Sequence, residues 1–189
     1  MKKDMEISQT KLLLAKACKE CMRNTSVESI TVKQICDKSH LSRQTFYRCF
    51  CDKYDLMNWY FDMLLHQSFD QMGSGKTVSE GLILKFEFIQ KEYVFFRASF
   101  SNDQQNNLKE HDFEMIFDFY QNLIREKGGQ LTTQMKDILE MYCYASIYMT
   151  VKWVMQGMPS SCVELCETMI AAMPKELNQL FIELHLLDA

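Results

Sequence analysis

Residues 31–56 read TVKQICDKSHLSRQTFYRCFCDKYDL, and this stretch decides the fold of the chain. Thr31 can cap a helix, because its hydroxyl can accept a hydrogen bond from a backbone N–H of the first turn. Val32 and Ile35 then place two apolar side chains three residues apart, on one face of that helix. The pattern predicts a short helix over residues 32–38.

A second short helix is expected after a tight turn. Leu41 supplies an apolar side chain at the turn, and Ser42 can cap the next helix. Phe46 and Phe50 recur four residues apart, so both can pack that helix inward. We therefore expect a helix over residues 43–48, and the two helices together form a helix-turn-helix.

The outer face of the second helix carries side chains that suit nucleic acid. These are hydrogen-bond donors and acceptors able to reach base edges and phosphate oxygens, namely Arg43, Gln44, Thr45, Tyr47 and Arg48, with Ser42 at the helix start. Arginine suits guanine, glutamine suits adenine, and a threonine can contact a thymine methyl or a phosphate. We expect Tyr47, Thr31 and Lys53 to bind phosphate, the last two from helix N-termini, where anions are favoured. The predicted partner is double-stranded DNA.

These residues also form a motif that resembles a known family. The motif comprises Thr31, Ile35, the turn at 39–42, Thr45-Phe46-Tyr47, Phe50, Lys53 and Asp55-Leu56. It is similar to the DNA-binding segment of TetR/AcrR-type transcriptional regulators. The run RQTFY, followed by DKYDL and Trp59, further resembles the subgroup of dihydroxyacetone-kinase operon regulators.

Two positions depart from the family pattern. His40 stands where the family usually has glycine, and it adopts a positive φ less readily than glycine, so we expect slight strain. Cys49 stands where His or Tyr is common, which removes one contact to phosphate or to the core.

The resemblance implies a homodimer that reads a palindromic operator and a helical body with an inducer site. Two-fold pairing also has its own logic, since one short helix makes few base contacts. Candidate lining residues are large and aromatic: Phe86, Tyr93, Phe117, Tyr120 and Tyr144. Such aromatic residues at helical spacing more often pack a core than line a pocket. If the subgroup resemblance holds, the effector is a partner protein that carries a small sugar, and no deep pocket is required.

The family pairs through late helices that form a four-helix bundle, and here residues 132–157 and 161–172 are the candidates. The first of these carries a stripe at helical spacing that includes Ile138, Met141, Ala145, Met149 and Trp153. The alternative interpretation is that this stripe packs within one chain.

Apolar residues recur at helical spacing almost throughout, so the chain is predicted to be all-α. We expect about nine helices, near residues 8–24, 32–38, 43–48, 53–73, 77–98, 107–127, 132–157, 161–172 and 175–187. An N-terminal three-helix helix-turn-helix DNA-binding domain should span 1–56, and a C-terminal helical effector and dimerisation domain should span 57–189. Residues 1–56 hold 11 Lys and Arg against 7 Asp and Glu, whereas 57–189 hold 10 against 18. The basic end is where DNA would bind.

Other classes of function have little support. Met1-Lys2-Lys3 is not followed by the apolar core of a signal peptide, and no segment can span a bilayer, so we expect a cytoplasmic bacterial protein. No Ser-His-Asp order, phosphate-binding glycine loop or H-E-x-x-H motif is present, so neither an enzyme nor a cofactor is expected. His66 and His111 each stand alone on a helix, so neither is expected to be a catalytic or metal-binding residue.

The eight cysteines leave a further question. Reduced thiols are expected in the cytoplasm, where free cysteine commonly fills small apolar positions of the core. Cys18 and Cys21 form a C-x-x-C, and Cys49 and Cys51 a C-x-C, but no second C-x-x-C or histidine pair stands at metal-ligand spacing, so no metal is expected. Two alternative functions stay open. One is a thiol-based metal or redox sensor, and the other is a co-regulator that acts by binding a sugar-kinase-like partner protein.

Overall fold

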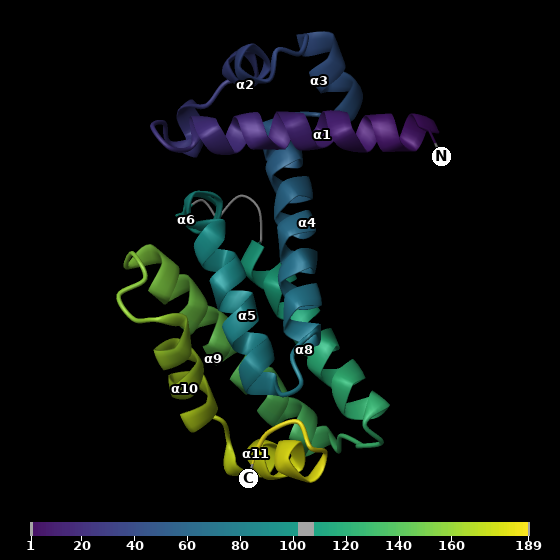
Figure 1. The fold of residues 1–189 in the computed structure, drawn as a ribbon, viewed down its shortest axis with the longest axis vertical. Coiled ribbons are helices and arrows are strands. Elements are labelled where there is room, and N and C mark those ends of the chain that lie inside the picture. Colours follow the sequence, from purple (N-terminus) through teal and green to yellow (C-terminus); the bar gives the residue numbers. More distant parts are fainter. Residues whose placement is uncertain (1, 102–107, 189) are drawn as a thin grey trace. The chain divides into compact units, whose positions relative to one another are not determined.

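The computed structural model describes the backbone of residues 2–101 and 108–188 and the side chains of residues 8–101 and 110–188, and these residues form helices and loops without strands (Figure 1). The prediction of an all-α fold is confirmed. The ten α-helices of the described residues are α1 (Lys2–Cys21), α2 (Val32–Ser39), α3 (Arg43–Cys49), α4 (Lys53–Gly73), α5 (Val78–Lys91), α6 (Tyr93–Ser101), α8 (Leu108–Glu126), α9 (Thr133–Met155), α10 (Cys162–Ala171) and α11 (Lys175–Glu183). A single 3₁₀ turn, η1 (Val27–Ser29), precedes α2.

The helix expected over residues 77–98 is divided in two. α5 ends at Lys91, the next residue Glu92 has a φ of −100° and a ψ of 18° that depart from helical geometry, and α6 begins at Tyr93. The Glu92 N–H is still bonded to the carbonyls of Phe88 and Ile89, at 3.2 Å each. Because the apolar spacing continues across this break, the sequence pattern does not reveal it.

The chain divides into two compact units. Unit 1 comprises the described residues of Met1–Leu64 and Val94–Leu108, and unit 2 those of Leu65–Tyr93 and Lys109–Ala189. Helix α4 is continuous, so its first part belongs to unit 1 and its last part to unit 2. The chain passes between the units after Leu64, Tyr93 and Leu108, and the first of these passages lies within α4.

Unit 1 is built on the contacts among α1, α2 and α3. The side chains of Leu14, Ile35 and Phe46 are completely buried and form its centre. Aromatic rings of α4 extend this core to α6, since the Tyr60 ring centroid lies 4.7 Å from that of Phe95. The predicted boundary at residue 56 stays a prediction for the DNA-binding function. The compact unit itself runs further along α4 and includes α6.

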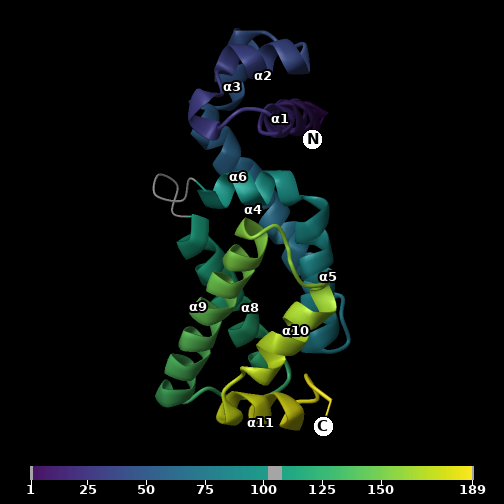
Figure 2. The ribbon, with the colours of Figure 1, turned by 90° about the vertical axis from the view of Figure 1, so that its left-hand side faces the viewer.

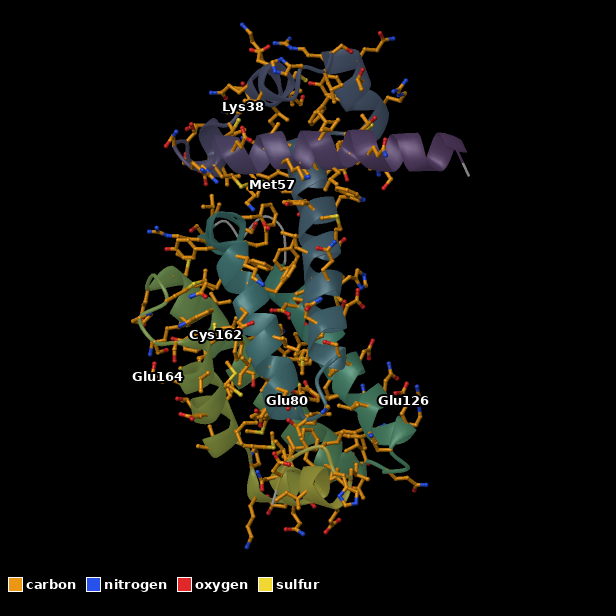
Figure 3. All side chains as sticks on the ribbon, in the orientation of Figure 1. Lys38, Met57, Glu80, Glu126, Cys162 and Glu164 are labelled. Carbon is orange, nitrogen blue, oxygen red and sulfur yellow. The ribbon has the colours of Figure 1, made fainter. Side chains whose placement is uncertain are left out.

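Unit 2 packs α10 against α5 and α11 against α9 (Figure 2). Several of its helices begin with side-chain caps. The Glu80 carboxylate accepts a 2.8 Å hydrogen bond from the Lys76 N–H before α5, and the Glu164 carboxylate accepts one of 2.8 Å from the Ser161 N–H before α10 (Figure 3). Such caps satisfy backbone donors that the first helical turn leaves open.

The core of unit 2 also holds one buried ion pair. Lys85 Nζ lies 3.6 Å from Asp112 Oδ1, and the two side chains are 3% and 4% exposed. The same ammonium lies 4.3 Å from the centroid of the Phe69 ring, a cation–π distance. Among the described residues, every helix is too short or too polar to cross a lipid bilayer.

Candidate nucleic-acid interface

The two helices of the predicted helix-turn-helix begin as the sequence indicates. The Thr31 hydroxyl accepts a 3.2 Å hydrogen bond from the Gln34 N–H, and the Gln34 side chain accepts one of 2.7 Å from the Thr31 N–H, which makes a full capping box on α2. Ser42 caps α3 by accepting a 3.0 Å hydrogen bond from the Thr45 N–H. Both predicted caps are confirmed.

The turn between the two helices contains the left-handed residue. His40 has φ 56° and ψ 30°, a conformation that glycine adopts without cost and other residues adopt under strain. The Leu41 N–H closes the turn with a 3.1 Å hydrogen bond to the Cys36 carbonyl. The side chain of His40 is exposed, and the turn forms with histidine in place of glycine.

Helix α3 has one buried face and one exposed face. Phe46 is completely buried and Phe50 is 3% exposed, and their ring centroids lie 5.9 Å apart. Tyr47 is 58% exposed. The remaining polar residues of the helix, Arg43, Gln44 and Arg48, are also exposed. The structure thus brings these four side chains together on the open side of one short helix.

The hydroxyl groups of Ser42 and Thr45, near the start of α3, form a hydrogen bond with each other. Ser42 Oγ and Thr45 Oγ1 lie 2.9 Å apart, and Thr45 is half-buried. The Thr31 hydroxyl likewise donates a 2.9 Å hydrogen bond to Gln34. These three residues shape the interface through their caps, and a contact of any of them with DNA stays a prediction.

Lys53 has a structural role that the sequence does not reveal. Its ammonium donates to the carbonyls of Val27 at 2.8 Å, Glu28 at 2.6 Å and Ile30 at 2.9 Å. An ammonium has three N–H donors, so these carbonyls use its full capacity. The residue ties the loop around η1 to the start of α4. The predicted phosphate contact would require Lys53 to release carbonyls that it now holds.

Lys11 is a second lysine that the structure places against aromatic rings. Its Nζ lies 5.1 Å from the Phe50 ring centroid and 5.5 Å from that of Trp59. Since the Phe50 and Trp59 rings lie 5.8 Å apart, the ammonium joins α1 to the end of α3 and the start of α4. This contact helps to hold the C-terminal end of α3 against α1 and α4.

The cysteines lie mostly in the core. Six are buried, namely Cys18, Cys21, Cys36, Cys143, Cys162 and Cys166, whereas Cys49 is half-buried and Cys51 exposed. Burial raises the pKa of the Cys18 thiol to about 12 and that of Cys143 to about 12, which suppresses the reactive thiolate. Across residues 2–101 and 108–188, no group of three or more His, Cys, Asp or Glu side chains could hold a metal ion.

The five aromatic residues predicted to line an effector site occupy different environments. Phe86 packs against Trp153 at 5.9 Å, and Tyr120 is 1% exposed with its ring 5.6 Å from that of Phe181. Tyr93 and Phe117 are half-buried, whereas Tyr144 is 44% exposed and lines an open groove. Phe86 and Tyr120 therefore act as core residues of unit 2.

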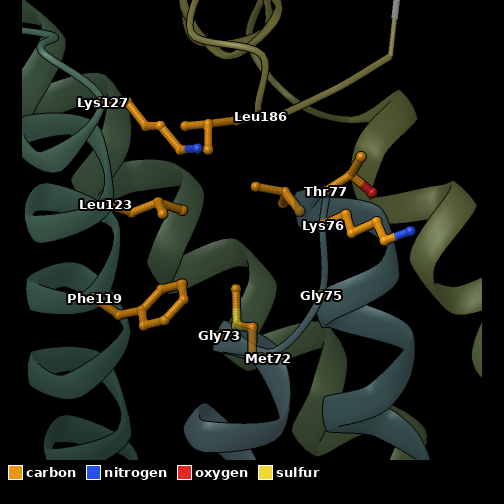
Figure 4. A pocket seen from close by; sticks show the side chains of 10 residues that line it. Met72, Gly73, Gly75, Lys76, Thr77, Phe119, Leu123, Lys127 and Leu186 are labelled. Carbon is orange, nitrogen blue, oxygen red and sulfur yellow. The ribbon is translucent and has the colours of Figure 1, made fainter.

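A separate small cavity lies where α5 begins (Figure 4). It has a volume of about 200 Å³, and its walls come from Met72, Phe119, Leu123, Lys127 and Leu186 with residues 73 and 75–78. Lys127 reaches toward Leu186 at its edge, whereas Lys76 points away from it (Figure 4). None of the five predicted aromatic residues belongs to this lining.

The predicted dimer residues also separate into two groups. Met141 is 73% exposed and Ala145 is exposed, whereas Ile138 and Met149 are half-buried. Trp153 is the exception, because its side chain is 3% exposed and its indole N–H donates a 2.9 Å hydrogen bond to the Ser160 carbonyl. Trp153 thus belongs to the core of unit 2, and its place in a dimer interface stays a prediction.

The family is decided by the C-terminal part of the chain. A family model for the C-terminal region of a TetR-type transcriptional regulator matches residues 76–175. The chain belongs to the TetR family. The half of the chain that shows this membership lies outside the helix-turn-helix, so it is independent of the motif at residues 31–56.

Individual relatives agree with this assignment. The HTH-type dhaKLM operon transcriptional activator DhaS of Lactococcus lactis subsp. lactis (strain IL1403) is 26% identical over 95 residues, which are 50% of this chain and 51% of that protein. The chain thus spans about half the length of the curated relative it matches. The relatives are transcriptional regulators and not enzymes.

Two solved structures share the fold. The dihydroxyacetone kinase operon activator DhaS has a TM-score of 0.69 at 20% identity, over 95% of this chain and 98% of that chain. A TetR family transcription regulator from Marinobacter aquaeolei VT8 has a TM-score of 0.54 at 16% identity, over 98% of this chain and 97% of that chain. The TetR fold therefore covers both units of this chain.

Proposed function

We propose that this TetR-family regulator is a cytoplasmic homodimer that reads a two-fold symmetric operator through α3, under control of a small molecule or a partner protein that acts on unit 2. The observation that carries the proposal is the two-sided character of α3. Phe46 and Phe50 anchor one side of the helix in the core, while Arg43, Gln44 and Tyr47 extend from the other. A recognition helix needs this arrangement, because its polar side chains must reach base edges from a rigid base.

Each exposed residue has a distinct role in the proposal. Arg43 donates to O6 and N7 of a guanine, and Gln44 pairs with N6 and N7 of an adenine. Tyr47 and Arg48 bind phosphates on either side and set the position of the helix without reading sequence. Thr45 contacts a thymine methyl with the part of its side chain that the cap leaves open.

Dimerisation follows from both the DNA and the surface of α9. A single α3 has seven residues and can reach few bases, so two copies in successive major grooves are needed for a selective complex. Met141, Tyr144, Tyr148 and Met155 leave large apolar side chains exposed on α9, which is typical of a surface that a partner covers.

Control by an effector requires a connection between the units, and α4 supplies it. Lys53 at its start holds the loop before α2, and residues from Leu65 belong to unit 2. A ligand that changes the packing of unit 2 thereby acts on the helix that carries the DNA-binding unit. By analogy with the relative named as an activator of the dhaKLM operon, the effector is a sugar-related small molecule or a protein that carries it.

No specific observation favours the two alternative functions. A thiol sensor needs accessible thiolates, but burial raises the pKa of both Cys18 and Cys21. Arg43, Gln44 and Tyr47 are exposed on α3 of the chain itself, and a co-regulator that acts only through a partner would leave them unused.

The test is fluorescence-anisotropy titration of the full chain with duplex DNA from the region next to its own gene, against a scrambled duplex. We expect selective binding that weakens steeply with salt, because phosphate contacts release counterions. Arg43→Ala should cost about 1–3 kcal/mol of binding free energy. Arg125→Ala is the matched control, since Arg125 is exposed on α8 in unit 2, and it should bind as the wild type does. Equal affinity for both duplexes would contradict the proposal.

A further inference from the structure

One face of α9 exposes a continuous seam, which we call the α9 seam. Its members recur every three or four residues, the spacing of a helix that pairs with another helix, and they are Met141, Tyr144, Ala145, Tyr148, Val151, Lys152 and Met155. Met141 and Tyr148 are 73% and 69% exposed, and Tyr144 and Met155 are 44% and 39% exposed. The buried residues of the same helix, such as Tyr142 and Ile147, face the core of unit 2. The seam is thus a second apolar stripe on α9.

The seam borders an open groove of about 600 Å³, lined by Glu110, Tyr144, Ile147, Tyr148, Val151 and Lys152. One wall of this groove is rigid. The Tyr144 ring stacks on Phe113 with centroids 3.9 Å apart and planes 4° apart, and its hydroxyl donates a 3.3 Å hydrogen bond to Glu110. The position of the Glu110 carboxylate is therefore linked to the seam.

The two ends of the seam carry opposite charge. Around Tyr144 lie the carboxylates of Glu110, Glu140 and Glu114, which add to desolvation in raising the pKa of the phenol. The other end carries the exposed cation Lys152. Eight residues of helix separate Tyr144 from Lys152, a rise of about 12 Å. One end of the seam is acidic and the other basic, with Tyr148 between them.

This pattern is complementary to itself in one orientation only. Residues 141 and 155, 144 and 152, and 145 and 151 are each equidistant from Tyr148. If two seams run antiparallel about Tyr148, each Lys152 faces the acidic end of the other copy. If they run parallel, Lys152 faces Lys152 and Glu110 faces Glu110, which costs free energy at both ends. A two-fold dimer requires the same patch on both subunits, and the antiparallel seam meets that requirement.

We propose that the α9 seams of two copies pair antiparallel about a two-fold axis beside Tyr148, with Lys152 of each copy placed against the Glu110 carboxylate and the Tyr144 ring of the other. The inference rests on the proposed homodimer and adds its register and its charge contacts. Lys152 would contact both the Glu110 carboxylate and the Tyr144 ring of the other copy, so that an ion pair and a cation–π contact act together. The contact occurs twice in each dimer.

Reciprocal charge changes test this register. In Lys152→Glu every homodimer places glutamate against Glu110, and in Glu110→Lys every homodimer places lysine against Lys152. We expect each variant alone to raise the dimer Kd in sedimentation equilibrium by at least about tenfold. In an equimolar mixture, the mixed dimer restores both pairs of opposite charge, so dimers should return with a Kd within about threefold of wild type.

Lys136→Glu is the matched control, because Lys136 is an exposed lysine of α9 outside the seam, and it should leave the Kd unchanged. Circular dichroism melts of all variants exclude unfolding as the cause of a change. The mixture itself guards against this artefact, since two misfolded chains would not rescue each other.

The outcomes separate this register from the proposed function. A wild-type dimer whose Kd is unchanged by either variant would overturn the register and leave the dimeric DNA reader intact. Loss of dimers without rescue in the mixture would overturn the register as well, because the loss would then lack reciprocity. A wild-type chain that stays monomeric would overturn the register and the homodimer together.

Discussion

Replacing Lys53 with methionine tests the structural role of its ammonium. Methionine keeps an unbranched apolar side chain of similar length and removes all three donors. The carbonyls of Val27, Glu28 and Ile30 lie 2.8, 2.6 and 2.9 Å from Nζ, so one substitution removes three hydrogen bonds from unit 1. The loop around η1 would then lose its tie to α4.

The cost follows from the number and the setting of these bonds. A hydrogen bond that involves a charged group contributes about 1.5–3 kcal/mol to stability. Lys53 is half-buried, so water can reach some of the released carbonyls and the three contributions do not add in full. We expect Lys53→Met to lower the free energy of unfolding of unit 1 by about 2–4 kcal/mol.

Urea titration followed by tryptophan fluorescence measures this cost in unit 1. The chain has two tryptophans, and Trp59 lies in unit 1 with its ring 5.8 Å from Phe50, whereas Trp153 lies in unit 2. A Trp153→Phe background leaves Trp59 as the reporter. Lys33→Met is the matched control, because Lys33 is exposed on α2, and it should change stability by less than about 0.5 kcal/mol.

The stability and the DNA affinity of Lys53→Met together distinguish a structural lysine from a phosphate ligand. If Lys53→Met were as stable as Lys33→Met but bound DNA weakly, the ammonium would be a phosphate ligand, as the sequence pattern predicts. If Lys53→Met lost stability and the folded fraction kept its salt dependence, the residue would be a tie and not a ligand. DNA anisotropy at several salt concentrations distinguishes the two, since each lost phosphate contact lowers the salt slope by about 1.

Three further perturbations follow from the structure. Because burial raises the pKa of Cys143 to about 12, its thiol should stay protonated at about pH 8 and react with an alkylating agent far more slowly than exposed Cys51. The alkylation rate of Cys143 should rise only toward about pH 12. Equal alkylation rates of the two cysteines, measured by mass spectrometry, would contradict this. His40→Gly should relieve the left-handed backbone and stabilise the chain by about 0.5–1 kcal/mol in thermal melts, and a lower Tm would argue against strain at φ 56°. Lys85→Met leaves the Asp112 carboxylate buried without a counterion and should lower the free energy of unfolding by about 3–5 kcal/mol in urea titrations. Adding Asp112→Leu to the same chain should recover most of this loss. A double variant no more stable than Lys85→Met would refute this.

The sequence predicts well those parts of the fold that depend on residues close together in the chain. Thr31 and Gln34, and Ser42 and Thr45, are three residues apart, so the caps that begin α2 and α3 can be deduced from the chain alone. The buried side of α3 is equally local, because Phe46 and Phe50 recur at helical spacing. The family motif and these caps therefore agree on the same short segment.

The parts that the sequence does not predict depend on distant residues. The carbonyls that Lys53 binds lie 23 to 26 residues earlier in the chain, and no local pattern indicates them. Helix α9 is apolar on two faces, so periodicity alone cannot decide which face meets a partner. The contact of Trp153 with Phe86 shows which face packs within unit 2, and that contact joins α9 to α5.

Selection of bound sites from a random duplex library measures whether α3 reads base sequence in a two-fold symmetric complex. With the wild-type chain, we expect an inverted repeat whose half-sites lie about one helical turn apart or a multiple of it. With Arg43→Ala, base preference should disappear at one symmetric pair of positions and persist elsewhere. A direct repeat, or identical base preferences for the two proteins, would show that α3 does not read sequence in this way.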